Sequence, residues 1–264
     1  MRLREKTIWV TGASSGIGEA LVRELATRGN RLIISARNRA KLETIAQELD
    51  LPPENVLVLP LDLSQPERCT EWVDQVLQHM GPIDLMIHNG GISQRSRAVE
   101  TDWKVDERLM VVDYLGTVAL TKALLPHFLE RKAGHFAVVS SLVGKFGTPL
   151  RSGYAAAKHA LHGFFDSLRA ELWQENIRVT LVCPGFIYTQ VSINALGADG
   201  KATGVMDEAQ AKGMPAAQFA RKMIHAIEAE KREVNIGGKE KYAVLLKRFF
   251  PGIFAKMIQT AKVT

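Results

Sequence analysis

Cysteine is scarce in this sequence, and metal-binding spacings are missing. The 264 residues include two cysteines, Cys69 and Cys183, with no CxxC pair and no Cys/His spacing of a zinc site. This excludes a fold held by several disulfides. One bridge stays open on the count alone, but we expect two free thiols in a reducing compartment and no bound metal.

The sequence also lacks a long apolar run and a block of like charge. No stretch reaches the roughly 18 apolar residues of a membrane span, and residues 1–6 lack the apolar run of a signal peptide. The net charge of +6 is spread along the chain, which argues against a nucleic-acid-binding arm. We therefore expect a soluble, cytoplasmic protein whose positive charge suits an anionic cofactor or an anionic surface.

Strand-like and helix-like segments alternate along the chain. Short runs rich in Val, Ile and Leu predict strands, and longer amphipathic segments between them predict helices. The strands are predicted at 7–10, 31–35, 56–59, 84–88, 135–140, 177–183 and 233–236. The helices are predicted at 16–28, 39–49, 67–80, 102–131, 152–173 and 215–229, the fourth bending or breaking at Gly116 or Pro126. The pattern favours one doubly wound Rossmann-type α/β domain over 1–264, with about seven parallel strands and helices on both faces.

A glycine-rich turn joins the first predicted strand to the first predicted helix. It reads Thr-Gly-Ala-Ser-Ser-Gly-Ile-Gly over residues 11–18. Glycines let the backbone approach a pyrophosphate closely, and a helix N-terminus offers unpaired N–H groups. An ordinary strand-to-helix turn is the alternative, but the flanking elements favour a phosphate site. Its candidate residues are Gly12, Ser14, Ser15, Gly16, Ile17 and Gly18.

This loop resembles the cofactor loop of the short-chain dehydrogenase/reductase family. The resemblance covers nearly the whole chain and continues through Asp62, Asn89, Ser141, Tyr154, Lys158, Pro184 and Gly185. It implies that Asp62 accepts the adenine amino group and that Asn89 holds the central strands against the cofactor. It also implies that the turn 184–189 anchors the nicotinamide carboxamide, through the Ile187 backbone and the Thr189 hydroxyl. A homodimer or homotetramer is usual in this family.

The end of the second predicted strand indicates which nicotinamide cofactor binds. Rossmann folds place an acidic residue there for the ribose of NAD, whereas an arginine accepts the 2′-phosphate of NADP. The strand ends at Arg37 with no acid beside it, and Ser35 and Arg39 are possible helpers. A solvated arginine at a helix start is the alternative. The sequence therefore predicts NADP(H), with Arg37 on the phosphate.

Tyr154 and Lys158 stand four residues apart in a predicted helix, so they share one helical face. A free phenol has a pKa of about 10, and a cation within reach lowers it toward neutrality. Tyr154 is thus the expected proton donor to a carbonyl, or acceptor from an alcohol. By family resemblance, Ser141, thirteen residues before Tyr154, hydrogen-bonds the substrate oxygen. Ser140 fits the family spacing less well.

Two departures from the family pattern affect the expected chemistry. Asp113 stands where a helical asparagine commonly completes the catalytic group, and His88 precedes Asn89. An acceptor-only carboxylate differs from an amide, so the usual proton relay is in question. Asp113 is kept as a catalytic candidate, and His88 is interpreted as a packed strand-end residue.

Segments such as 117–126 and 192–200 resemble the dehydrogenase/reductase member seven B branch, which is linked to lipophilic carbonyl substrates. The resemblance implies an NADP(H)-dependent oxidoreductase acting on a carbonyl or secondary alcohol, with a lipophilic ketone as the expected substrate. A 3-oxoacyl-thioester reductase is a second enzyme hypothesis. A non-catalytic NADP-sensing protein is a third, although a sensor need not keep Ser141, Tyr154 and Lys158 together.

Two further segments carry functional expectations. The segment 191–213 has four glycines and no clear period, which is typical of a mobile lid, a surface insertion being the alternative. The C-terminal tail 242–264 interleaves apolar residues at helical spacing with lysines, and Pro251 should break the helix. Its apolar face is expected to pack on the domain or a neighbouring subunit, or to make weak peripheral contact with a membrane.

Overall fold

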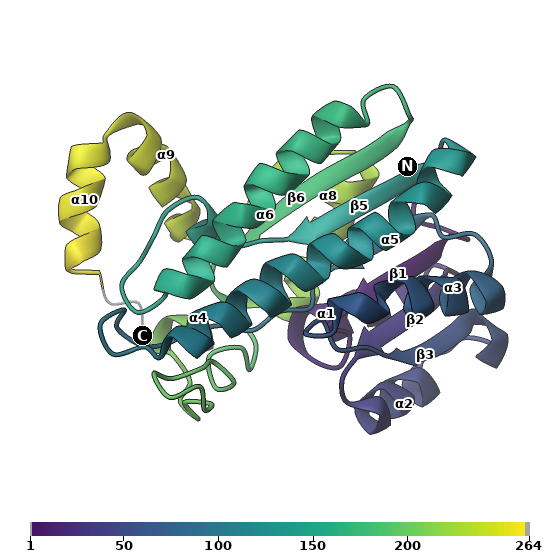
Figure 1. Ribbon diagram of the computed structural model, residues 1–264, viewed down its shortest axis with the longest axis horizontal. Helices are drawn as coiled ribbons and strands as arrows, with labels where there is room; N and C mark the ends of the chain where they lie inside the picture. Colours follow the sequence, from purple (N-terminus) through teal and green to yellow (C-terminus); the bar gives the residue numbers. More distant parts are fainter. Residues whose placement is uncertain (1, 262–264) are drawn as a thin grey trace.

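The computed structural model describes residues 2–261, and it contains a seven-stranded parallel sheet in the order β3-β2-β1-β4-β5-β6-β9 (Figure 1). The strands are β1 (Thr7–Thr11), β2 (Arg31–Ala36), β3 (Val56–Pro60), β4 (Leu85–His88), β5 (Gly134–Val139), β6 (Ile177–Pro184) and β9 (Glu233–Ile236). Every end lies within one residue of its predicted position. The predicted doubly wound Rossmann-type sheet is confirmed.

Helices cover both faces of the sheet, as predicted (Figure 1). One layer holds α1 (Gly16–Ala26), α2 (Arg39–Glu48) and α8 (Ala216–Glu228), and the other holds α3 (Cys69–Met80), α4 (Trp103–Met110), α5 (Gly116–Arg131) and α6 (Ser152–Glu171). The apolar stripes of each layer are buried against the strands, Leu21 and Ile224 on one side, Leu124 and Phe165 on the other. Burial of these stripes holds the strand ends, and so the site, in place.

The predicted long helix is a continuous rod from α4 to α5, joined by a π-helical turn, η3 (Val111–Leu115). The helix does not break at Gly116 or Pro126, because Gly116 continues it and Pro126 lies inside α5, so that half of the expectation was wrong. A bend at either residue stays a prediction. Within residues 2–261 this rod alone is long and apolar enough to cross a membrane. Leu120 and Phe128 on it are fully buried against the sheet instead.

Smaller elements lie around the carboxyl ends of the strands. They are β7 (Ile187–Tyr188), β8 (Met214–Pro215), α7 (Glu208–Ala211), α9 (Ala243–Phe249), α10 (Pro251–Gln259) and the 3-10 turns η2 (Pro66–Arg68), η4 (Leu142–Gly144) and η5 (Lys239–Tyr242). A further 3-10 turn, η1 (Pro53–Asn55), leads into the amino end of β3. The tail is helical with a break, as predicted, and Pro251 is the first residue of α10. Residues 262–264 of the predicted tail lie outside the described residues.

Both cysteines are free thiols in the interior, as expected. Burial raises the pKa of Cys69 to about 11 and that of Cys183 to about 12. Because the thiolate is the reactive form, neither sulfur is suited to nucleophilic or redox chemistry in the folded chain.

Candidate active site

A cleft of about 1660 Å³ opens at the carboxyl ends of the strands. It includes the point where β1 and β4 lie side by side and the chain connections diverge, where open α/β sheets bind ligands. Its volume exceeds the roughly 300–1,000 Å³ of an ordinary small-molecule pocket, so a dinucleotide and a second molecule fit together. The predicted site residues that line it are Gly12, Ser14, Ser15, Gly16, Ile17, Arg37, Asp62, Asn89, Ser141, Tyr154, Lys158, Pro184, Gly185, Ile187 and Thr189.

The glycine-rich turn has the geometry that a pyrophosphate requires. Gly12 has a φ of +65°, a left-handed conformation that side chains disfavour. Gly18 lies behind the cleft wall, and a Cβ there would stand 2.1 Å from the Gly12 carbonyl oxygen, so only glycine lets α1 start this close. Ser15, the N-cap of α1, makes no side-chain capping bond. The first N–H groups of α1 are therefore not capped by this side chain, and they suit an anion at the helix N-terminus.

Asn89 ties the loop after β1 to the end of β4. Its amide nitrogen donates to the carbonyl oxygens of Thr11 at 3.0 Å and Gly12 at 3.3 Å, while its backbone N–H donates to the Thr11 hydroxyl at 3.0 Å. These bonds fix the phosphate loop relative to the neighbouring strand. This is the bracing position that the family resemblance implied.

Arg37 is exposed at the end of β2, on the wall of the cleft. The two possible helpers are engaged elsewhere. The Ser35 hydroxyl accepts a hydrogen bond from Trp9 Nε1 at 2.9 Å, and Arg39 pairs with Glu43 at 3.3 Å. Arg37 forms no ion pair with a carboxylate of residues 2–261, so its guanidinium is available for an anionic ligand.

Asp62 lies on the same wall, after β3. Its Oδ1 accepts hydrogen bonds from the Ser64 N–H at 3.0 Å and the Ser64 hydroxyl at 2.8 Å. These bonds fix the orientation of the carboxylate toward the cleft that it lines.

The three predicted catalytic residues come together across β5 and α6. Lys158 Nζ lies 5.6 Å from the ring centre of Tyr154, and both line the cleft with Ser141. Ser141 Oγ accepts from the Val143 N–H at 3.3 Å and keeps its own proton for another partner. Ser140 turns inward, with Oγ donating to the Lys158 carbonyl and 3.0 Å from His162 Nε2. The geometry thus favours Ser141 over Ser140 as the substrate contact.

Asp113 lies behind Lys158 and not on the cleft wall. Its Oδ1 accepts from the Ile92 N–H at 2.7 Å, and its Oδ2 lies 3.5 Å from Lys158 Nζ. Both side chains are buried. Burial raises the pKa of Asp113, and for Lys158 the attraction of Asp113 and Tyr154 outweighs the effect of burial, so its pKa is also raised. Asp113 can therefore hold Lys158 in place, but it is buried and does not reach the substrate.

His88 is packed and not in the cleft, as the sequence suggested. Its Nε2 lies 2.9 Å from the Thr121 hydroxyl, and its ring stacks on Phe136 with centroids 6.0 Å apart. Burial lowers the pKa of His88 to about 3, so the ring is neutral.

Sequence reasoning missed Gln94, which caps the helix that carries Tyr154 and Lys158. The buried Gln94 Oε1 accepts from the backbone N–H groups of Gly153 at 2.9 Å and Tyr154 at 3.3 Å. Its Nε2 donates to the Thr101 hydroxyl at 3.1 Å. These contacts satisfy two of the N–H groups that start α6. No local pattern around Gln94 points to this role.

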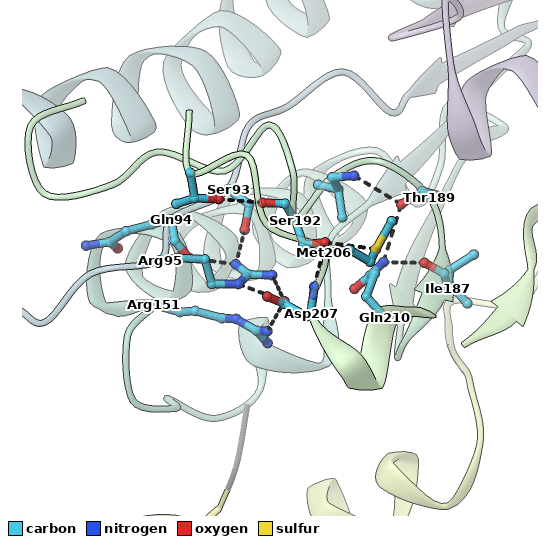
Figure 2. Close-up of polar contacts among 12 residues, drawn as sticks. Ser93, Gln94, Arg95, Arg151, Ile187, Thr189, Ser192, Met206, Asp207 and Gln210 are labelled. Atoms are coloured by element: carbon cyan, nitrogen blue, oxygen red, sulfur yellow. Dashed lines mark hydrogen bonds and ion pairs between the residues drawn. The ribbon is translucent and has the colours of Figure 1, made fainter. Parts of the chain in front are cut away.

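A buried ion cluster was also missed (Figure 2). Asp207, in the predicted lid, accepts from Arg95 at 2.6 and 2.8 Å and from Arg151 at 3.2 Å. Three residues later, Gln210 Nε2 donates to the Ile187 carbonyl and to the Thr189 hydroxyl. The segment 191–213 therefore joins the wall beside Tyr154 to the turn predicted to anchor nicotinamide. Its predicted mobility stays a prediction.

The fold and site together define a class, the Rossmann-type oxidoreductases that use a nicotinamide dinucleotide. Sequence comparison narrows it, because a model of the short chain dehydrogenase family matches residues 6–198. The chain belongs to the short chain dehydrogenase family.

Named relatives are consistent with this. Dehydrogenase/reductase SDR family member 7B of Bos taurus is 39% identical over 263 residues, covering 97% of this chain and 81% of the relative. A family protein 7-like of Drosophila melanogaster is 41% identical, covering 96% and 79%. An alcohol dehydrogenase of Thermococcus sibiricus, solved with 5-hydroxy-NADP, has 27% identity and a TM-score of 0.75, covering 89% of this chain and 97% of its own. The resemblance to the member seven B branch is confirmed.

Proposed function

We propose that this protein transfers a hydride between NADP(H) and a lipophilic ketone or its secondary alcohol. One observation carries the proposal: a single cleft runs from Arg37, past the glycine-rich loop, to Ser141, Tyr154 and Lys158. The same cleft continues to apolar side chains of the C-terminal helices. Cofactor, proton donor and apolar substrate can thus occupy one continuous space.

The choice of NADP(H) rests on charge at the end of β2. Arg37 is a permanent, planar cation with no carboxylate beside it, which suits the 2′-phosphate of NADP(H). The ribose 2′-hydroxyl of NAD(H) would find no acidic acceptor at this position. Asp62, Asn89, the loop 12–18 and the turn 184–189 hold the rest of the dinucleotide. When bound, nicotinamide supplies or accepts the hydride.

The chain supplies the proton and the alignment. Ser141 donates a hydrogen bond to the carbonyl oxygen, and Tyr154 protonates that oxygen as negative charge develops on it. The buried cation Lys158, with Nζ 5.6 Å from the Tyr154 ring centre, lies beside this proton donor. Asp113 and the Val139 carbonyl, 3.5 and 3.4 Å from Lys158 Nζ, position that cation. Asp113 is thus a positioning residue in this mechanism.

The substrate preference rests on the side chains beyond the catalytic group. Leu245, Leu246, Phe249 and Met257 of α9 and α10 line the outer part of the cleft. Burying apolar surface contributes about 25 cal/mol per Å², so a long alkyl or ring substituent gains affinity there. The member 7B relatives give no substrate in their names, so this preference is carried by the lining alone.

We also propose that the active form is a homodimer or homotetramer. Leu115, Leu129 and Trp173, on or beside the α4–α5 rod and α6, are exposed although large and apolar. The proposal rests on the family, in which such assemblies are usual, and a contact between copies would cover these side chains. Light scattering after size-exclusion chromatography measures the mass directly, and a monomeric mass at working concentration would refute this.

The decisive test uses Arg37→Ala beside Arg39→Ala, its neighbour already paired with Glu43. Binding of NADPH and NADH is followed by fluorescence, and oxidation of each by a panel of ketones of increasing chain length. Arg37→Ala should weaken NADPH roughly 10- to 100-fold through loss of a charge-assisted contact, and leave NADH nearly unchanged. Arg39→Ala should change neither. Equal affinity of the unmodified protein for both cofactors would overturn the NADP assignment, and absence of ketone-dependent oxidation would favour a cofactor sensor.

A further inference from the structure

The C-terminal helix pair has one face packed and one face bare. Figure 1 shows α9 and α10 together at one end of the molecule, outside the layers of sheet and helices. On the inner face Phe254 is buried, 5.2 Å from the Phe146 ring centre, and Leu246 and Ile258 pack on the same cluster. The expected packing of the tail on the domain is therefore confirmed, and it covers only part of the apolar surface of α9 and α10.

The helix pair holds an unusual share of exposed apolar side chains, most of them at the rim of the cleft. Of fourteen large apolar residues exposed in the described part of the chain, six lie between Tyr242 and Met257. Phe249 is 66% exposed, Ile253 60% and Phe250 57%. Soluble proteins scatter such residues singly, and a cluster of this kind marks an interaction surface.

The same segment carries most of the net charge of the protein. Residues 239–261 contain five cationic side chains and one acidic one, a net +4 out of +6 for the whole chain. The cations are Lys239, Lys241, Lys247, Arg248 and Lys256. Within residues 2–261 none of them forms an ion pair with a carboxylate. An apolar face bordered by free cations is typical of a helix that lies in a lipid headgroup region.

A second copy of the chain is the less favourable occupant. A two-fold contact is self-complementary, so it would place this +4 surface against itself. Like charges brought together oppose association, whereas an anionic surface attracts them. The place of these side chains also favours a lipid surface. Tyr242, Phe249 and Met257 are exposed and line the cleft, so a surface bound there would lie at the opening, or mouth, of the cleft.

We propose that α9 and α10 dock the mouth of the cleft on an anionic lipid bilayer. The aromatic side chains enter the headgroup region and the lysines meet anionic lipid, so an apolar substrate passes between bilayer and cleft without crossing water. This proposal does not depend on which cofactor or ketone the enzyme uses.

The test is flotation of the full chain with vesicles of phosphatidylcholine alone or mixed with phosphatidylglycerol. Binding should require phosphatidylglycerol and fall away at about 1 M salt, where the Debye length is about 3 Å. Phe249→Ser with Ile253→Ser should reduce binding at least tenfold, whereas Val99→Ser, which is 82% exposed and distant in sequence, should not. Phe254 is left intact, because it is buried.

A second variant tests the contribution of the positive charge to vesicle binding. Lys247→Gln with Arg248→Gln should weaken binding roughly 30-fold, since each cation contributes about fivefold near an anionic surface. Circular dichroism confirms that each variant is folded. No flotation of the unmodified protein, or equal flotation of the tail and control variants, would overturn the proposal. So would a fall in oligomer mass in the tail variants without vesicle binding, which would assign the face to a second copy.

Discussion

Asp207→Ala tests whether one buried carboxylate holds the segment 191–213 against the domain. Asp207 is 4% exposed and accepts from Arg95 at 2.6 and 2.8 Å and from Arg151 at 3.2 Å. The variant keeps both guanidiniums, each less than a tenth exposed, and removes the carboxylate that they share. Removing one partner of a buried ion pair costs about 3–5 kcal/mol.

We expect this loss to appear as local opening and not as global unfolding, because the segment lies outside the seven-stranded sheet. A cost of 3–5 kcal/mol corresponds to roughly 10²- to 10⁴-fold faster exchange through opening. The reporters are the amides of Gly197, Thr203 and Gly204, which donate to carbonyls within the segment. Hydrogen exchange read by mass spectrometry measures them. The Michaelis constant for NADPH should rise too, since Gln210 loses its hold on Thr189.

Asp199→Ala is the matched control. It removes a carboxylate from the same segment, but this one is 61% exposed and 3.4 Å from Lys201. Exposed pairs contribute little, so exchange should stay near that of the unmodified protein. Equal exchange in both variants would refute the reasoning. In the unmodified protein the same amides test the lid: NADPH plus substrate should raise their protection, and unchanged protection would count against closure.

Three other outcomes are expected. Tyr154→Phe should bind NADPH normally while kcat falls roughly 10²- to 10⁴-fold, and near-full turnover would show that the proton comes from elsewhere. Gln94→Ala should lower the free energy of unfolding by about 1–2 kcal/mol and lower kcat, because two N–H groups at the start of α6 lose their acceptor. Gln94→Glu keeps an acceptor oxygen and should restore both the stability and kcat, which thermal unfolding and steady-state kinetics measure. Asp113→Asn removes a charge that raises the pKa of Lys158 while burial, which lowers it, stays; the alkaline loss of activity should therefore begin at lower pH, and an unchanged pH profile would contradict this.

The strands and the phosphate loop were predictable because local residues decide them. Short buried runs between turn residues leave few alternatives, so each strand end was placed within one residue. Helix 102–131 was predicted too, but its irregular turn was misplaced. The irregular turn is η3, which contains Asp113 and neither Gly116 nor Pro126. Asp113 contacts Ile92 and Lys158, which are distant in sequence, and no local pattern shows these contacts.

The supports of the site were not predictable from local pattern. Asp207 lies 112 residues from Arg95 and 56 from Arg151, and Gln94 lies 60 residues from Tyr154. Asp207 and Gln94 sit in segments without periodicity, where the sequence alone shows only a polar residue. Family resemblance located the cofactor and catalytic residues that line the cleft. The residues that hold this site in place, such as Gln94 and Asp207, could be found only from the structure.

The two buried thiols give the molecule internal probes of its own opening. Cys69 is the first residue of α3 and is buried in the core, and Cys183 lies near the end of β6, in the cluster against which Tyr154 packs. A thiol-labelling reagent reaches either sulfur only when the surrounding structure separates, since both side chains are buried. The raised pKa of each thiol also suppresses the reactive thiolate in the folded chain. Labelling rates at the two positions would time the loosening of the helix layer and of the catalytic edge separately. Oxidants that mark exposed thiols would leave the folded chain unmarked.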